Sequence, residues 1–335
     1  MPKYSVIVPV YNRPFEMQEL LKSLSIQIFK DFEVIVVEDG SDQKSDGIIA
    51  SFKDQLTIKY FFKNNSGPGD SRNFGIEKSL GDYFIFFDSD CIVPEEYFLI
   101  LERELNKRKL DAFGGPDNAH ASFSDSQKAI NYAMTSFFTT GGIRGGKKQL
   151  GKFQPRSFNM GMSRDVYNKL GGFGDIHPGE DPDLSYRIMD AGFKVGLITE
   201  AFVYHKRRID FNKFTTQVYK FGIVRVILNK WHPKRKSPVF YLPSIFLICS
   251  FVLVVGSVYT SSIIGLFPLG LFALILMIDS LRLTKSISIS LKAVYASFIQ
   301  LYAYGFGFLK SLIQISLIGR PERTAFPSFF FNKKM

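Results

Sequence analysis

The chain has 335 residues, 46% of them apolar and 15% aromatic, so it is long enough to bury a large core and to hold two regions. Its two cysteines, Cys91 and Cys249, cannot form a disulfide framework and favour a reducing compartment. The formal net charge of +11 admits nucleic acid, anionic lipid or phosphorylated ligands as partners. We expect no signal peptide, because the apolar run that begins the chain is too short for one.

Short apolar runs typical of strands alternate with helical patterns over the first hundred or so residues. The runs are YSVIVPVY, FEVIVVED, TIKYFF and DYFIFFD, and the helical patterns between them are PFEMQELLKSLSIQ, DQKSDGIIASF and GDSRNFGIEKSL. This alternation predicts an α/β domain with a mainly parallel sheet and helices on both faces. Ligands of such sheets bind at the carboxyl ends of the strands, so the residues there are the first site candidates.

Two of these strand ends carry candidates for binding a nucleotide. Tyr11, after the first strand, could stack on a base, and Asp39, after the second, could accept a hydrogen bond from a base N–H. The glycine-rich stretch 64–75 leads into a helix with Arg72 and Asn73, and a helix N-terminus suits phosphate. It contains neither a Walker A motif nor GxGxxG, and a Gly-Pro-Gly before a helix is by itself only a turn.

Two aspartates, Asp88 and Asp90, follow the strand-like run YFIFF with one residue between them. Residues i and i+2 of a strand point the same way, so both carboxylates can face one ligand. Mg²⁺ and Mn²⁺ are commonly held by one or two carboxylates together with substrate phosphates. The alternative is that the two acids only end the strand and begin a turn. The pair alone leaves both interpretations open.

After Asp111 the alternation weakens. Residues 141–157 are glycine-rich and basic, which predicts a mobile loop. The stretch GEDPDLSYRIMDAGF predicts a helix with Glu180 and Asp181 in its first turn. A carboxylate at this place is either a general base or a residue that only stabilises the helix dipole. His205 ends the run AFVYH and is either a structural residue or a metal ligand.

The last third of the chain has the composition of a membrane region. The window 206–236 holds ten basic residues and one acid, and the segment 239–278 carries no charged residue at all. A span needs ~20 apolar residues, so this segment fits two spans, whereas a soluble helix needs a polar face. The flanking basic residues predict a cytoplasmic N-terminal region. Residues 293–318 are either a third span or a helix lying in the interface.

In this order, SVIVPVYN, EDGS, SRNFG, DSD and GEDPDL resemble the family 2 glycosyltransferases with a GT-A fold, over roughly residues 3–210. The resemblance implies a Rossmann-like, mainly parallel sheet with helices on both faces, followed by C-terminal transmembrane helices. It implies a nucleotide-sugar-binding half at 1–110, an acceptor-binding half with the ED motif at 111–232, and a membrane region at 233–335.

The resemblance also implies roles for individual residues. Asp90, Asp88 and His205 would hold Mn²⁺ or Mg²⁺ against the donor diphosphate, with Asp90 the better direct ligand and Asp88 nearer the ribose. Asp181 would be the catalytic base, with Glu180 beside it. The residues expected to bind the nucleotide sugar are Pro9, Tyr11, Asn12, Arg13, Asp39, Arg72, Asn73, Asp88 and Ser89.

The implied activity is an inverting transfer of a sugar from a nucleoside diphosphate sugar, with UDP favoured, to a hydroxyl of a lipid-linked or glycan acceptor in surface polysaccharide or glycolipid synthesis. Because the Gln-x-x-Arg-Trp motif of processive members is absent, and RVILNKW is the nearest stretch, we expect a non-processive enzyme. It would be a multi-pass protein of the cytoplasmic membrane, in contact with membrane lipids, with the catalytic domain facing the cytoplasm.

Three alternatives remain at this stage. A polyprenyl-phosphate glycosyltransferase has an acceptor that is already ionised and needs no strong base. A non-catalytic or dinucleotide-binding Rossmann-type protein, here a nucleotide-binding membrane protein, is disfavoured by the missing GxGxxG. A nucleic-acid binder is disfavoured because the basic residues concentrate beside a predicted span, so we expect no nucleic-acid partner. Arg207 and Arg208 either clamp phosphates or belong to that juxtamembrane cluster.

Overall fold

The structure is a computed structural model that describes residues 1–141, 153–206 and 210–331. The chain divides into two compact units. Unit 1 comprises Met1–His120, Phe153–Lys206 and Ser328–Met335, and unit 2 comprises Ala121–Lys152 and Arg207–Pro327. Unit 1 is therefore built from three separate stretches of chain, the last of which follows the whole of unit 2.

Unit 1 contains a seven-stranded sheet with the order β3-β2-β1-β4-β8-β6-β9. All neighbours are parallel except at β8, which runs antiparallel to β4 and to β6. This confirms the predicted mainly parallel sheet. The strands are β1 (Tyr4–Val10), β2 (Phe32–Asp39), β3 (Ile58–Lys63), β4 (Tyr83–Phe87), β6 (Ala112–Gly114), β8 (Asn159–Ser163) and β9 (Val195–Leu197).

Helices cover both faces of this sheet because alternate strand residues point to opposite sides. Val6 and Val8 of β1 belong to one buried cluster with the helix residue Leu20, whereas Ile7 belongs to a second cluster with Ile76 and others. The predicted two-sided arrangement is therefore confirmed. The helices of unit 1 are α1 (Pro14–Ser25), α2 (Asp46–Ala50), α3 (Pro68–Glu77), α4 (Tyr97–Arg108), α7 (Arg164–Leu170) and α8 (Glu180–Asp190).

A small second sheet in unit 1 has the order β5-β10-β7, with β5 at Cys91–Ile92, β10 at Val203–His205 and β7 at Asp117–Asn118. β10 pairs antiparallel with β5, and this register sets His205 opposite Cys91. Its parallel pairing with β7 aligns Val203 with Asp117. The small sheet thus brings His205 to the segment that follows β4.

Unit 2 is helical, and its elements are α5 (Asp125–Thr135), α6 (Phe137–Thr140), α9 (Phe211–Trp231), α10 (Leu242–Tyr259), α11 (Phe267–Thr284), α12 (Ile287–Ser311) and α13 (Glu322–Ala325). α9 and α12 pack closely because glycines lie at their contact. A Cβ on Gly222 would lie 2.8 Å from the backbone nitrogen of Phe308. A Cβ on Gly307 would collide with the backbone of Tyr219, so larger residues at either glycine would separate the helices.

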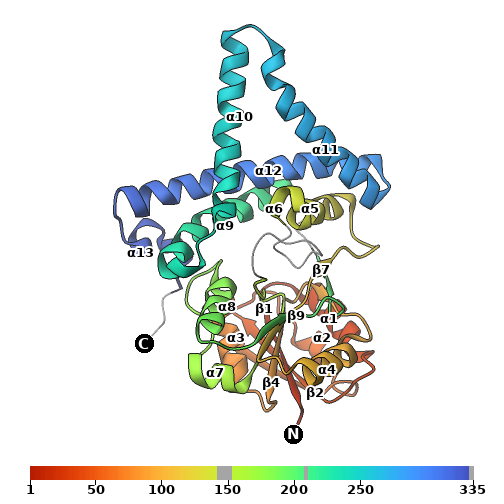
Figure 1. Ribbon diagram of the computed structural model, residues 1–335. Coiled ribbons are helices and arrows are strands. Elements are labelled where there is room, and N and C mark those ends of the chain that lie inside the picture. Colours follow the sequence, from red (N-terminus) through yellow and green to blue (C-terminus); the bar gives the residue numbers. More distant parts are fainter. Residues whose placement is uncertain (142–152, 207–209, 332–335) are drawn as a thin grey trace. The chain divides into compact units, whose positions relative to one another are not determined.

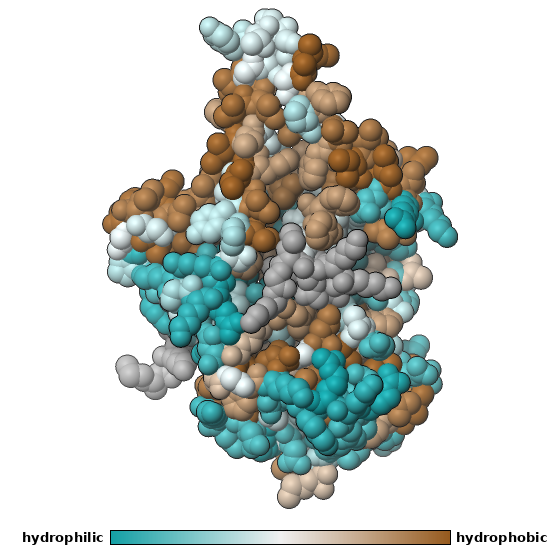
Figure 2. Space-filling view, in the orientation of Figure 1, coloured by the Kyte–Doolittle hydropathy of each residue, from teal (hydrophilic) through white to brown (hydrophobic). Residues whose placement is uncertain are grey.

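Two helices of unit 2, Pro238–Tyr259 and Ile263–Thr284, are long and apolar enough to cross a membrane. Little of either is buried, and the visible surface over α10 and α11 is largely hydrophobic (Figure 2). Within this unit, α12 runs across the ends of α10 and α11 rather than alongside them (Figure 1). The segment 293–318, predicted to be either a third span or an interfacial helix, forms most of α12 and the π-helical turn Leu312–Leu317.

Candidate active site

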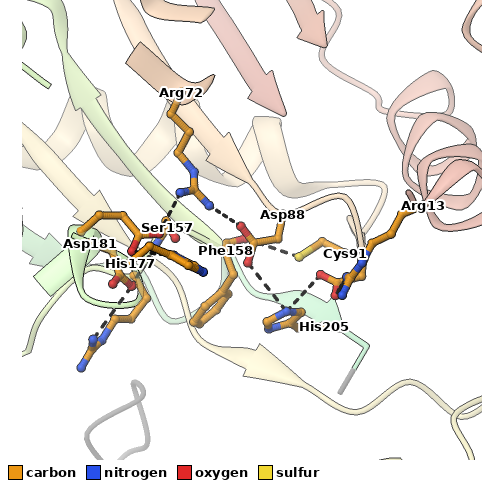
Figure 3. Close-up of polar contacts among 12 residues, drawn as sticks. Arg13, Arg72, Asp88, Cys91, Ser157, Phe158, His177, Asp181 and His205 are labelled. Carbon is orange, nitrogen blue, oxygen red and sulfur yellow. Dashed lines mark hydrogen bonds and ion pairs between the residues drawn. The ribbon is translucent and has the colours of Figure 1, made fainter. Parts of the chain in front are cut away.

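The predicted pair Asp88 and Asp90 follows β4, at the carboxyl end of the central sheet. β4 is buried from Phe84 to Phe87, and the two acids begin the turn that leads into β5. Asp90 accepts a hydrogen bond from Nη1 of Arg13, the residue before α1. Asp88 accepts one of 2.6 Å from Nη2 of Arg72, as Figure 3 shows. Both acids are therefore held by arginines that follow other strands, Arg13 just before α1 and Arg72 within α3.

His205 lies against the same acids. Its Nε2 is 3.1 Å from Oδ1 of Asp90 and 4.0 Å from Oδ2 of Asp88. Its Nδ1 is 3.8 Å from Oδ2 of Asp117, and its ring stacks on Phe158 with centroids 5.0 Å apart. A carboxylate behind an imidazole fixes the ring orientation, as it does behind metal-ligating histidines. The structure thus brings together the three residues predicted as metal ligands.

Asp90, Cys91 and His205 each offer a possible ligand atom, and these atoms lie within 4.8 Å of one another. The Cys91 Sγ donates to the backbone oxygen of Phe158 at 3.5 Å. Because Mn²⁺ and Mg²⁺ prefer oxygen ligands and accept imidazole more readily than a thiol, Asp90 and His205 fit such an ion better than Cys91 does. The donor set therefore suits a divalent cation.

The Asp90 carboxyl is charged over the ordinary pH range. Burial alone would raise its pKa, but His205 and then Arg13 hold the pKa well below its usual range. Such a carboxylate is ready to bind a cation without first losing a proton.

Arg72 links the two acidic motifs. Its side chain is 3% exposed, and its guanidinium contacts Asp88 through Nη2 and Glu180 through Nη1, at 2.6 and 3.2 Å. The guanidinium also lies over the ring of Phe173, 5.3 Å from its centroid. Burial alone would lower the pKa of Arg72, but Asp88, Glu180 and Asp181 outweigh it and raise the pKa. Arg72 therefore stays charged and ties α3 to β4 and α8.

Asp181, the predicted base, lies in the first turn of α8 beside Glu180. Its Oδ2 accepts a 3.3 Å hydrogen bond from the backbone N–H of Ser157 and lies 3.9 Å from Nη1 of Arg156. Burial is the largest cause that raises its pKa; Arg156 opposes the shift and the charge of Glu180 adds to it. A carboxyl whose pKa is raised accepts a proton more readily, which suits a general base.

Glu180 is held differently from its neighbour. Its Oε1 faces Arg72, and its Oε2 lies 3.0 Å from Nδ1 of His177. Burial alone would raise its pKa, but His177 and then Arg72 lower the pKa to about 2. Glu180 is thus a fixed anion that orients the start of α8, whereas Asp181 is the carboxyl of the pair that can take up a proton.

Asp39 ends β2 and is 4% exposed. Its Oδ1 accepts from the backbone N–H of Ser66 at 3.0 Å and from Nζ of Lys63 at 2.6 Å, and its Oδ2 accepts from the N–H of Gly67 at 3.0 Å. The loop that precedes α3 is therefore folded onto this carboxylate. Because a carboxylate has about four lone-pair sites, capacity remains for a further donor such as a base N–H.

Two of the residues predicted to bind the nucleotide sugar hold neighbouring loops. Asn12, with φ +53°, accepts at Oδ1 from the N–H groups of Asp42 and Gln43, at 2.8 and 3.0 Å. Asn73 both donates to the backbone oxygen of Phe173 and accepts from its N–H, at 2.9 and 2.8 Å. The side-chain amide of Asn73 is thus already committed to the loop before α8.

The remaining predicted residues lie at the same strand ends, and among the described residues no side-chain hydrogen bond assigns them a role. Pro9 lies in β1, Tyr11 is 51% exposed just after it, and Ser89 is buried between the two acids. The sequence interpretation missed Arg156 and Asp117, which reach the site through pairings far along the chain. Of the predicted loop 141–157, residues 142–152 lie outside the described residues, as do Arg207 and Arg208.

Comparison with known proteins places the first half of the chain in a family. Residues 5–171 match the family model described as Glycosyl transferase family 2. A protein of Rickettsia conorii described as an uncharacterized glycosyltransferase is 46% identical over 88 residues, which are 26% of this chain and 15% of that protein. The GalNAc(5)-diNAcBac-PP-undecaprenol beta-1,3-glucosyltransferase of Campylobacter jejuni is 34% identical over 117 residues, 34% of this chain and 38% of that protein. The chain spans less than half the length of either relative.

The fold also has a counterpart among solved structures. The mannosyltransferase PcManGT from Pyrobaculum calidifontis, in complex with GDP-Man and Mn²⁺, aligns with a TM-score of 0.63 over 89% of this chain and 87% of that chain. The two sequences are 14% identical, so this likeness concerns the fold alone.

Proposed function

Because the chain belongs to glycosyl transferase family 2 through its residues 5–171, we propose that it is an inverting, metal-dependent glycosyltransferase that takes a sugar from a nucleoside diphosphate sugar. The observation that carries this proposal is the meeting of Asp88, Asp90 and His205 at the end of β4, which Arg72 joins to Glu180, the neighbour of Asp181 in α8. Residues 1–110 would bind the donor and 111–232 the acceptor, and within 233–335 the two apolar helices, Pro238–Tyr259 and Ile263–Thr284, would enter the membrane.

Asp90 and His205 would hold Mn²⁺ or Mg²⁺, which when bound neutralises the charge of the diphosphate leaving group. Asp88 would contact the ribose or a ligand water. Arg13 would lie beside the same diphosphate, because its guanidinium already reaches Asp90. Asp39 would accept a hydrogen bond from the base, and Tyr11, which is half exposed, would stack on it.

Asp181 would take the proton of an acceptor hydroxyl as that oxygen attacks the anomeric carbon. The bond from this carbon to the diphosphate breaks as the new glycosidic bond forms, so the anomeric centre inverts and the nucleoside diphosphate leaves. The raised pKa of Asp181 supports this role, because it brings the carboxyl closer to the operating pH. A hydroxyl acceptor needs a base to remove its proton, whereas a phosphate acceptor is already ionised. The presence of a candidate base at Asp181 therefore favours a hydroxyl acceptor.

The acceptor would be carried on a lipid or a glycan. Two observations support a lipid: the two apolar helices of unit 2, and the printed name of the Campylobacter relative, which contains undecaprenol. Both helices would span the cytoplasmic membrane, with unit 1 on the cytoplasmic side, as the basic residues beside the first span favour. An enzyme anchored in the membrane meets a lipid-linked acceptor by diffusion in two dimensions instead of three, which shortens the search for the acceptor.

The test is incubation of the detergent-purified protein with a panel of UDP-, GDP- and dTDP-sugars and Mn²⁺, scored by nucleotide release. The proposal expects release from one donor, with UDP-sugars tried first, because hydrolysis reveals the donor before the acceptor is known. Asp90→Asn is the matched control and should release little. The absence of release from every donor, with and without membrane lipid extract, would count against the proposal.

A further inference from the structure

The chain returns to unit 1 after the whole of unit 2, and its described end contacts both sides of the candidate site. Phe330 forms an antiparallel bridge with Ile176. The backbone oxygen of Phe329 accepts from the N–H of His177 at 2.7 Å, and the N–H of Phe331 donates to the oxygen of Asp175 at 3.0 Å. The end segment, residues 329–331, is therefore fixed by backbone bonds to the loop that precedes α8.

The ring of Phe331 packs on Gly67, the residue before α3. A Cβ built on Gly67 would lie 2.5 Å from both Cδ2 and Cε2 of Phe331. Gly67 has φ +93°, which a residue with a side chain rarely adopts. The same ring lies 6.3 Å from the ring of His177, measured between centroids. Phe331 thus touches both the loop before α3 and the histidine before α8.

Each of these neighbours holds one acid of the site. The N–H of Gly67 donates to Oδ2 of Asp39 at 3.0 Å, and Nδ1 of His177 lies 3.0 Å from Oε2 of Glu180. The loop 64–67 has no helix or strand of its own and is held on Asp39 by hydrogen bonds, so packing from outside the loop adds to what keeps it there. The ring of Phe331 supplies such packing.

We propose that Phe331 is a positioning residue for the donor site, whose ring holds Gly67 and its N–H against Asp39 so that this carboxylate is fixed before the donor arrives. This inference rests on the proposed function, in which Asp39 receives the base. Phe331 touches no reacting atom and acts through Gly67. Its removal therefore weakens donor binding and leaves the transfer step unchanged.

The direct test is donor kinetics for Phe331→Ala in the full-length protein. If the loop then holds its binding conformation about a tenth of the time, the donor KM rises about tenfold while kcat stays within about twofold of wild type. Phe331→Leu, which keeps an apolar side chain of similar bulk, should restore most of the affinity. Phe330→Ala is the matched control, because neighbouring side chains of an extended segment point to opposite sides.

Hydrogen exchange of the ligand-free protein separates this inference from the proposed function. Phe331→Ala should speed exchange at the amides of Ser66 and Gly67, which bond Asp39, and Phe330→Ala should not. Faster exchange together with a raised donor KM supports the inference. Unchanged exchange in a folded Phe331→Ala protein, or a kcat that falls while KM stays constant, overturns it. If wild type releases no nucleotide while exchange does speed up, the proposed function fails and the support of the loop by Phe331 stands.

Discussion

Nη1 of Arg72 lies 3.2 Å from Oε1 of Glu180, a residue 108 positions further along the chain. The other terminal nitrogen of the same guanidinium bonds Asp88. A single buried cation therefore joins the acids after β4 to the acids that begin α8. In the proposed mechanism the donor and the base meet at one carbon atom, so this link would set the distance on which transfer depends.

Arg72→Met should destabilise the protein strongly. It leaves the buried Glu180 with the half-exposed His177 as its ion-pair partner and removes the cation that bonds Asp88, and breaking one side of a buried pair costs about 3–5 kcal/mol. Urea unfolding in detergent, followed by the fluorescence of the chain, measures the loss. Arg103→Met is the matched control, since Arg103 is 64% exposed beside Glu104 and such a pair contributes about 0–1 kcal/mol. Equal midpoints for the two variants would contradict the assigned role of Arg72.

The two acids after β4 should differ in importance. Asp90→Asn is expected to lower nucleotide release more than Asp88→Asn, because Asp90 lies 3.1 Å from His205 and Asp88 lies 4.0 Å away. The Mn²⁺ concentration that gives half-maximal release should also rise more for Asp90→Asn. The reverse order for both readouts would assign direct coordination to Asp88 instead.

Asp181→Asn distinguishes the two classes of acceptor. For a hydroxyl acceptor the loss of the base should lower turnover about 10²–10⁴-fold, with donor KM little changed. The wild-type rate should also fall as the pH is lowered, and it should begin to fall above the ordinary pKa of an aspartate, because burial raises the pKa of Asp181. Turnover near that of wild type for Asp181→Asn would favour a polyprenyl phosphate acceptor.

The ion pair of His177 with Glu180 should make stability depend on pH. Burial alone would lower the pKa of His177, but the charge of Glu180 outweighs it and raises the pKa above 6.5. The stabilisation is then fully present below pH 6.5 and is lost as the pH rises through the folded-state pKa. His177 is 44% exposed, so the effect is small. Thermal midpoints from about pH 6 to about pH 9 should fall in wild type and stay flatter in His177→Gln. Parallel curves would contradict the pairing.

The helices α10 and α11 should place their connecting turn on the far side of the membrane from unit 1. Thr260→Cys, in a Cys249→Ser background, is expected to react with an impermeant maleimide in intact cells, since Thr260 follows α10 and is exposed. Lys107→Cys, on the exposed side of α4, is the control and should react only after permeabilisation. Labelling of both positions only after permeabilisation would contradict two spans.

The sequence predicted those site residues that follow strands. Apolar runs end at Asp39 and Asp88, and the carboxyl ends of parallel strands lie at one edge of a sheet. The strand pattern of the sequence therefore predicts that these two acids lie near each other. The two apolar helices of unit 2 followed from length and the absence of charge. These features are local, and each can be recognised within a short window of residues.

Other parts depend on contacts that no local pattern contains. Asp117 and Arg156 reach His205 and Asp181 through the small sheet and the approach to β8. The pattern SRNFG suggested that Asn73 binds the donor, but its amide bonds the backbone of Phe173, one hundred positions away. The return of Phe331 to Gly67 also follows from tertiary structure alone, because nothing near residue 331 in the sequence indicates it.

The most direct test of the central claim is nucleotide release by the protein after its metal is removed with EDTA. We predict that release from the preferred nucleotide sugar is lost, that Mn²⁺ restores it in wild type, and that Mn²⁺ does not restore it in Asp90→Asn. Release that is unchanged by EDTA and equal in the two proteins would contradict a metal-dependent transferase centred on Asp90 and His205.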